Sequence, residues 1–203
     1  IAEKVQTIEN ILPSKLIVKQ SCLKQDDMRS GNSISLLSIG RFCEAKNFDN
    51  IPDICRRIVK SGLNVKWYLI GYGGDEERIR QKIAENGMQE RVILLGKKDN
   101  PYPYMRACDL YVQPSRYEGK AVTVREAQLL GKPVVITKYA TSSSQLEDNI
   151  DGIIVPMDNA GCAEGIVDLL REPERMKKLS EHCAKRDYTN NAEIEKIYAL
   201  MED

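Results

Sequence analysis

Short apolar segments alternate along this chain with segments of helical periodicity, and this alternation limits the possible folds more than any other feature. Apolar runs at 36–39 and 134–136 suit strands that are covered on both faces. Between the strands, apolar residues recur at helical spacing, first at Phe48, Ile51, Ile54, Cys55, Ile58 and Val59. The alternation predicts an α/β fold, with a doubly wound, mostly parallel Rossmann-like sheet and helices on both faces.

The same pattern gives the expected boundaries of the elements. We expect strands at residues 16–20, 33–39, 65–71, 91–96, 109–115, 133–137 and 152–156. We expect helices at residues 3–12, from about 48, from about 75, and at about 123–131, 159–171, 174–186 and 192–202.

Composition excludes several classes of function. The chain has 203 residues, of which 30 are Lys or Arg and 30 are Asp or Glu, so no overall field favours nucleic acid. The six cysteines form no CxxC pair and the single histidine is His182, so we expect no metal site. Scattered cysteines suit a reducing cytoplasm, and no apolar run reaches membrane-spanning length.

Ligands of doubly wound sheets bind beyond the carboxyl ends of the strands. The loops expected there are residues 40–46, 71–74, 96–99, 115–121 and 137–144. In the first loop, Arg41 and Lys46 lead into a helix and could clamp a diphosphate. For an isolated pair of cations, solvated surface charges are the more frequent interpretation. In the second loop, Glu76 replaces the third glycine of the dinucleotide fingerprint, which argues against NAD.

Two glutamates make the fourth loop the most informative. Glu118 and Gly119 follow the strand expected at 109–115, and Glu126 is expected on the buried side of the next helix, together with Val122. A carboxylate there suits a cis-diol, because it can accept hydrogen bonds from both ribose hydroxyls. The pattern Thr123-x-x-Glu126 also matches a helix capping box. The residues alone leave these two interpretations about even.

Five ordered stretches together resemble one known family. QPSRYEGKAVTVREAQLLGKPVVIT, with Glu118 and Glu126, is similar to the E-x7-E signature of retaining glycosyltransferases of the GT-B fold, group 1 or family 4. LLSIGRFCEAKN resembles their GR-x-x-x-x-K stretch, and WYLIGYGGDEERI resembles their G-x-G segment. RVILLG with YMRACDLYVQPS resembles their base-binding loop and next strand, and LEDNIDGIIVP resembles a later stretch. The resemblance covers residues 33–156.

The resemblance implies a role for each matching residue. Arg41 and Lys46 would hold the donor diphosphate, and Glu126 would bind the ribose hydroxyls. Glu118 would be the catalytic residue, facing the donor sugar and the transferring centre. The backbone at Gly96, Lys97 and Lys98 would meet the base.

The same resemblance places further contacts at the fourth loop. Gly119 precedes Lys120 and Ala121, where the family often has an aromatic residue and a glycine. Lys120 would add a cation near the phosphates. Backbone amides at Ala121, Val122 and Thr123 would support the phosphate or the sugar.

The resemblance also implies a division of the chain. Residues 1–30 are expected to be an interdomain segment, and residues 31–190 the Rossmann-like domain that binds the nucleotide sugar, the C-terminal half of a GT-B fold. Residues 191–203 would form a helix that packs toward an N-terminal, acceptor-binding domain not contained in this chain. Apolar side chains of that helix would then be exposed or repacked, namely Ile194, Ile197, Tyr198 and Met201.

The implied activity moves a sugar from a UDP-, GDP- or ADP-sugar to an acceptor hydroxyl with retention, without a metal or another cofactor. The expected setting is bacterial surface polysaccharide or glycolipid synthesis in the cytoplasm, with possible peripheral association of the full-length protein at the inner face of the membrane. This chain alone is expected to bind the donor without turnover. Two alternatives are a non-catalytic nucleotide-sugar-binding module and a GT-B-fold epimerase or phosphorylase.

Overall fold

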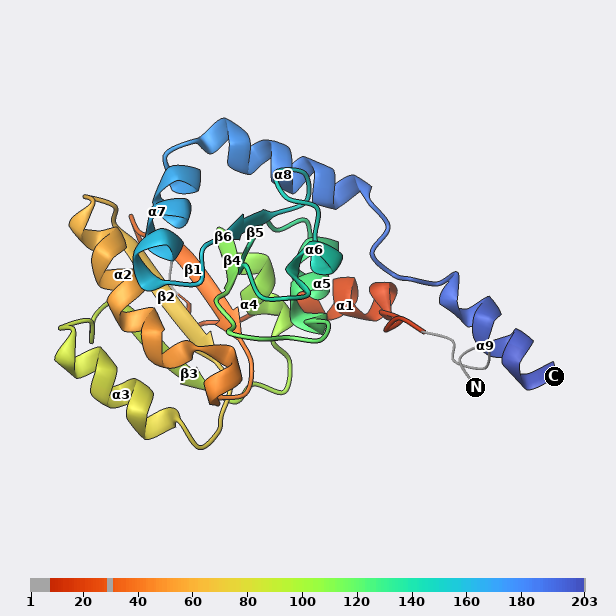
Figure 1. Ribbon diagram of the computed structural model, residues 1–203, viewed down its shortest axis with the longest axis horizontal. Helices are drawn as coiled ribbons and strands as arrows, with labels where there is room; N and C mark the ends of the chain where they lie inside the picture. The colour runs from red at the N-terminus through yellow and green to blue at the C-terminus, as the bar shows by residue number, and fades with distance from the viewer. Residues whose placement is uncertain (1–7, 29–30, 203) are drawn as a thin grey trace.

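Six parallel strands organise the computed structural model (Figure 1), in which residues 8–28 and 31–202 are described. The strands are β1 (Ile34–Ile39), β2 (Val65–Ile70), β3 (Val92–Gly96), β4 (Leu110–Gln113), β5 (Val134–Thr137) and β6 (Ile153–Val155). They follow the order β3-β2-β1-β4-β5-β6. This order confirms the predicted doubly wound, Rossmann-like fold. It also places the switch point, where the direction of winding reverses, between β1 and β4.

Two apolar cores cover the two faces of the sheet. Adjacent side chains of β1 enter different cores, Leu36 one and Leu37 the other, as the pleat of a strand requires. The Leu36 core is closed by α2 (Ile51–Lys60), α3 (Glu76–Glu85), α7 (Asn159–Leu170) and α8 (Pro173–Lys185). The Leu37 core is closed by α4 (Tyr102–Ala107) and α5 (Val122–Leu129).

The N-terminal part of the chain differs from the sequence prediction. Residues 16–20, expected to be a strand, lie within helix α1 (Ser14–Ser21), which packs on α4. Its buried residues are Ile17 and Ser21, four positions apart on one helical face. A short apolar run does not separate strand from helix by periodicity alone, so the strand predicted at residues 16–20 is wrong. The helix expected at 3–12 is also wrong for residues 8–12, which form no regular structure; residues 3–7 lie outside the described part.

The last helix, α9 (Glu193–Glu202), lies away from the sheet, beyond α1 in Figure 1. Its side chains Ile194, Tyr198 and Met201 are exposed, and Ile197 is half-buried. The exposure agrees with the expectation for this helix, whereas the assignment of domain boundaries stays a prediction. No helix among residues 8–28 and 31–202 combines the length and apolar character needed to cross a bilayer.

The loops after β1 and β2 are joined through backbone contacts. The Phe42 amide donates to the Tyr72 carbonyl at 2.8 Å, and the Asp75 amide donates to the Phe42 carbonyl at 3.2 Å. A Cβ added to Gly71 would lie 1.9 Å from the Gly40 carbonyl oxygen. Gly71 therefore permits the loop after β1 and the loop after β2 to approach each other closely. The loop after β2, residues 71–74, supports the loop after β1 through these backbone contacts.

Gly71→Ala is expected to lower the free energy of unfolding by roughly 1–3 kcal/mol, because the methyl group forces the two loops apart. The matched control is Gly74→Ala in the same loop, where an added Cβ meets no atom within 4 Å. Chemical denaturation of both variants tests the difference. Equal stability of the two variants would contradict the close-approach role of Gly71.

Candidate functional site

The candidate site lies where the carboxyl ends of β1, β2 and β3 meet. A hollow of about 290 Å³ opens there, lined by Ile39, Gly40, Arg41, Ile70, Gly71, Tyr72, Lys97, Lys98 and Pro101. The hollow therefore brings Arg41, predicted to hold the diphosphate, together with Lys97 and Lys98, whose backbone is predicted to meet the base. The hollow suits an anionic ligand with a flat apolar part, because the cations are accompanied by Tyr72 and aliphatic side chains.

The three cations of the hollow differ in how they are held. Arg41 is exposed and forms no hydrogen bond or ion pair with another described residue. The Lys97 ammonium lies 5.6 Å from the centre of the Tyr72 ring. The Lys98 ammonium pairs with Asp27 at 2.6 Å, and this contact helps to lower the pKa of the Asp27 carboxyl. Arg41 is thus the cation most available to a ligand.

Gly96 ends β3 in a left-handed conformation, with φ of 69°. It pairs with Ile70 at the point where the register between β2 and β3 shifts. A side chain at this position would strain the backbone, so glycine is what lets the chain turn into Lys97 and Lys98. The turn places these residues at the rim of the hollow.

Lys46 and Glu118, far apart in sequence, are in contact. The Lys46 Nζ donates to Glu118 Oε1 at 2.5 Å. The Glu118 side chain is only 9% exposed and the Lys46 side chain 22%. The pair joins the loop after β1 to the loop after β4, directly at the switch point.

Two further donors converge on the same oxygen of Glu118. The Ser115 hydroxyl donates to Oε1 at 2.7 Å, and the Gln113 amide nitrogen donates to it at 3.3 Å. Within the described chain, Oε2 accepts no hydrogen bond. The carboxylate is therefore fixed through one oxygen, and the other is left for a ligand.

Glu126 is partly buried on α5 and accepts a hydrogen bond from the Tyr102 hydroxyl at 2.9 Å. Burial raises the pKa of the Glu126 carboxyl, an effect that the Tyr102 hydrogen bond partly offsets. Burial and the neighbouring carboxylate raise the pKa of Tyr102 to about 12. The phenol therefore keeps its proton at neutral pH and acts as the hydrogen-bond donor to Glu126. The Tyr102–Glu126 contact connects α4 to α5 near the hollow.

The capping-box interpretation of Glu126 is wrong. Helix α5 begins at Val122, so Thr123 lies inside the helix, and the N-cap position is Ala121, which makes no side-chain cap. The expected buried face is also incorrect, because Val122 is exposed and the buried residues are Val124, Ala127 and Gln128. Glu126 therefore lies beside the buried face rather than at its centre.

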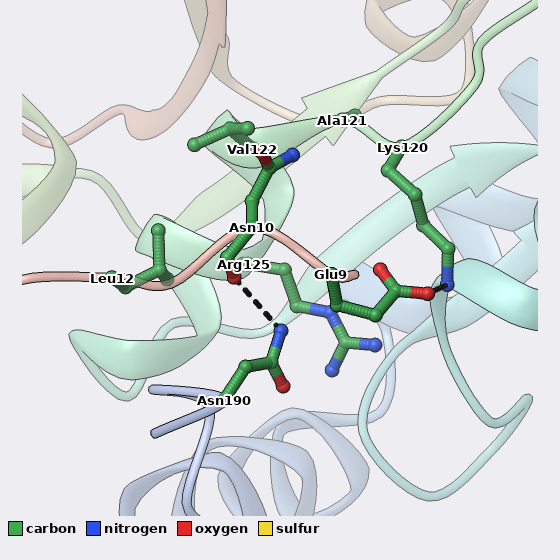
Figure 2. A pocket seen from close by; sticks show the side chains of 8 residues that line it. All are labelled: Glu9, Asn10, Leu12, Lys120, Ala121, Val122, Arg125 and Asn190. Atoms are coloured by element: carbon green, nitrogen blue, oxygen red, sulfur yellow. Dashed lines mark hydrogen bonds and ion pairs between the residues drawn. The ribbon is translucent and has the colours of Figure 1, made fainter. Parts of the chain in front are cut away.

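Lys120 is engaged by the protein itself. Its ammonium donates to the Ser144 carbonyl at 2.7 Å and pairs with Glu9 at 3.2 Å. Figure 2 shows Glu9 and Asn10 from the N-terminal segment meeting the start of α5 beside Asn190. Lys120 thus lies where the N-terminal segment, at Glu9 and Asn10, meets Asn190 near the C-terminus. It does not line the hollow that contains Arg41.

The amides at the start of α5 are only partly available. The Ala121 amide donates to Gln145 Oε1 at 2.7 Å, which corrects the expectation that it faces a ligand. Among the described residues, the amides of Val122 and Thr123 have no acceptor. Gly119 has open space around its Cα, since an added Cβ meets no atom within 4 Å. The helix start therefore retains two free donors and room in front of them.

Sequence reasoning missed the residues that hold the predicted ones in place. Tyr102 lies on α4 and Arg116 in the loop before Glu118, and neither has a local pattern that indicates its partner. Ser115 belongs to the QPS segment three residues before Glu118, so its proximity to Glu118 is the one contact that the sequence indicates. In the described part of the chain, no cluster of three or more His, Cys, Asp or Glu side chains could hold a metal ion.

The burial of Glu126 predicts a pH-dependent stability difference. Its folded pKa lies above the ordinary value of 4.5, so the folded state binds more protons than the unfolded state in this range. Wild type should therefore lose stability relative to Glu126→Gln as the pH rises from 4.5 through the raised pKa. Melting temperatures of both proteins between about pH 4 and about pH 8 test this. A difference in melting temperature between the two proteins that stays constant over this pH range would contradict it.

Comparisons with known proteins find relatives of this chain among glycosyltransferases. The chain is 26% identical over 151 residues to a Campylobacter jejuni protein named N-acetylgalactosamine-N,N'-diacetylbacillosaminyl-diphospho-undecaprenol 4-alpha-N-acetylgalactosaminyltransferase. It is 27% identical over 182 residues to the amylovoran biosynthesis glycosyltransferase AmsK of Erwinia amylovora. The alignments cover 74% and 85% of this chain, but only 40% and 43% of those proteins.

Solved structures share the fold. The Anabaena protein HepE in complex with UDP superposes with a TM-score of 0.82 at 20% identity, over 100% of this chain and 58% of HepE. Sucrose-phosphate synthase from Thermosynechococcus elongatus gives a TM-score of 0.79 at 22% identity, over 97% of this chain and 52% of the synthase.

The model of one protein family matches residues 23–186, which is most of the chain. The matched range contains all six strands, Lys46 and both glutamates of the E-x7-E pattern. The chain therefore belongs to the family of group 1 glycosyl transferases.

Proposed function

We propose that this chain is the donor-binding domain of a retaining glycosyltransferase and holds a nucleotide diphosphate sugar at the switch point between β1 and β4. The observation that carries the proposal is the Lys46–Glu118 contact at 2.5 Å. It brings a cation suited to a diphosphate against a carboxylate suited to a sugar. Both stand at the sheet edge where ligands of this fold class bind.

The other side chains of the site can each contact one part of such a donor. The base would occupy the hollow near Tyr72, Lys97 and Lys98. The ribose hydroxyls would donate to Glu126, whose Oε2 accepts no hydrogen bond within the described part of the chain. Pro101 lines the hollow and adjoins Tyr102, the partner of Glu126, so the base and ribose positions are neighbours.

The diphosphate would lie between Arg41, Lys46 and the start of α5. Lys46 uses one of its three N–H bonds on Glu118 and can give another to a phosphate oxygen. The free amides of Val122 and Thr123 add donors at the positive end of a helix dipole. These groups would stabilise the negative charge that develops on the departing nucleotide diphosphate, which lowers the barrier to sugar transfer.

Glu118 would face the donor sugar through Oε2. The three donors on Oε1 keep this carboxylate oriented, so it can accept hydrogen bonds from the sugar or stabilise positive charge that develops at the transferring centre. We assign it no covalent step. The proposal requires no metal, because fixed cations and amides neutralise the leaving group.

The relatives suggest the biological setting. One is named for transfer to a diphospho-undecaprenol-linked acceptor and another for amylovoran biosynthesis. We infer a role in bacterial surface polysaccharide or glycolipid synthesis, at the cytoplasmic side of the membrane. An N-terminal domain beyond this chain would bind the acceptor. Complementation with such a domain would separate this transferase from a non-catalytic binding module, because only the transferase would gain turnover.

Calorimetric titration of the chain with UDP, GDP, ADP and their sugars tests donor binding directly. One of these nucleotide diphosphates should bind, and the corresponding nucleoside should bind more weakly because it lacks the diphosphate. Absence of binding by all of them at millimolar concentration would overturn the proposed function.

Arg41→Ala should weaken binding of the preferred nucleotide diphosphate by about 1 kcal/mol, since an exposed charged donor is lost. Its affinity for the nucleoside should not change. Arg80→Ala is the control, because Arg80 is an exposed arginine on α3 that pairs with Glu76. Equal nucleotide affinities of Arg41→Ala and wild type would contradict the assigned role of Arg41.

Glu126→Gln should weaken binding of both the nucleotide and the nucleoside by about 1–3 kcal/mol, because both carry the ribose. The parallel loss distinguishes Glu126 from Arg41. An unchanged nucleoside affinity would show that Glu126 does not contact the ribose.

A further inference from the structure

Arg116 ties the loop that carries Glu118 to the loop that carries Lys46. Its amide donates to the Ala45 carbonyl at 2.9 Å, and its Nη1 donates to the Glu44 carbonyl at 2.5 Å. The guanidinium also forms two parallel bonds to Asp49, Nη1 to Oδ1 at 3.1 Å and Nη2 to Oδ2 at 3.2 Å. One side chain thus contacts the chain on both sides of Lys46, at Glu44 and at Asp49.

Asp49 is a buried carboxylate that two arginines hold in place. Its side chain is only 4% exposed, and a second cation, Arg78 of α3, contacts Oδ2 at 2.9 Å. A buried carboxylate of this kind is costly unless paired and hydrogen-bonded, and both arginines meet that need. Asp49 lies in the short helical turn that immediately precedes α2.

The geometry points to Arg116 as a positioning residue that sets Lys46 against Glu118 and so aligns the diphosphate-binding cation with the sugar-facing carboxylate. Lys46 lies between Glu44 and Asp49 in the chain, and both of these residues are held by Arg116. Glu118 follows Arg116 by two residues. The contacts of Arg116 therefore set the distance between the Lys46 ammonium and the Glu118 carboxylate. This inference rests on the proposed function.

Only arginine fits the position. The guanidinium is planar and carries five N–H donors, so it can hold a carbonyl and both oxygens of a carboxylate together. A lysine would retain the charge beside Asp49 but could not reproduce the parallel pair of bonds. Arg116 is also far less exposed than Arg78, with 26% against 57% of the side chain accessible.

The experiment compares Arg116→Gln with Arg78→Gln. Both substitutions remove one cation from Asp49 and leave the other in place. Of the two arginines, only Arg116 also bonds to the Glu44 and Ala45 carbonyls before Lys46, so Arg78→Gln controls for the loss of charge. UDP and uridine are titrated into each variant by calorimetry, and thermal stability is recorded in parallel. If another nucleotide diphosphate binds wild type best, it and its nucleoside replace this pair.

Arg116→Gln should bind UDP about tenfold more weakly, because Lys46 is no longer held at its position, and should bind uridine as wild type does. Arg78→Gln should leave the ratio of UDP to uridine affinity unchanged, whatever its stability. Arg116→Lys, which keeps a cation beside Asp49, should fold and still show a lowered UDP affinity. It therefore provides the decisive comparison if Arg116→Gln does not fold.

The inference is overturned if the Arg116 variants keep the wild-type ratio of UDP to uridine affinity, or if Arg78→Gln lowers that ratio equally. Failure of wild type to bind any nucleotide diphosphate is a different result. It would overturn the proposed function, whereas wild-type binding with unaffected Arg116 variants would overturn the positioning role alone.

Discussion

The parallel pairing of β1 with β4 determines where the site forms. Leu36 is aligned with Leu110 and Leu37 with Tyr111, so the two strands end side by side. The Ser38 hydroxyl donates to the Val112 carbonyl at 2.5 Å and fixes the pair near its carboxyl end. The loops that follow are therefore forced together, which is why two charged residues so distant in sequence can touch.

The Lys46–Glu118 pair illustrates how this scaffold prepares a site before a ligand arrives. Removing two charges from water costs free energy, and a buried pair persists when further hydrogen bonds satisfy its remaining groups. Ser115 and Gln113 provide such bonds to Glu118. Side chains held in this way lose less conformational freedom on binding, so more of the contact energy appears as affinity. Arg116 and Asp49, which bond to each other, hold the backbone next to Lys46 and Glu118 in the same way.

Much of this could be predicted from sequence because it follows from strand order and motif spacing. The alternating pattern identifies the six strands, and the carboxyl-end rule brings Arg41, Lys46 and Glu118 to one edge of the sheet. The contact of Tyr102 with Glu126 was not predictable, because a side-chain pair between two helices leaves no local signal. The buried face of α5 and the helical state of α1 depend on their packing partners, which propensity does not encode.

Hydrogen exchange of the backbone amides, measured with and without a saturating nucleotide diphosphate, tests the central claim most directly. The account predicts slower exchange in residues 40–46 and 115–123, the two loops at the switch point, with smaller changes in the rest of the sheet. Protection confined to another edge of the domain, with these two loops unchanged although the nucleotide is bound, would contradict the account.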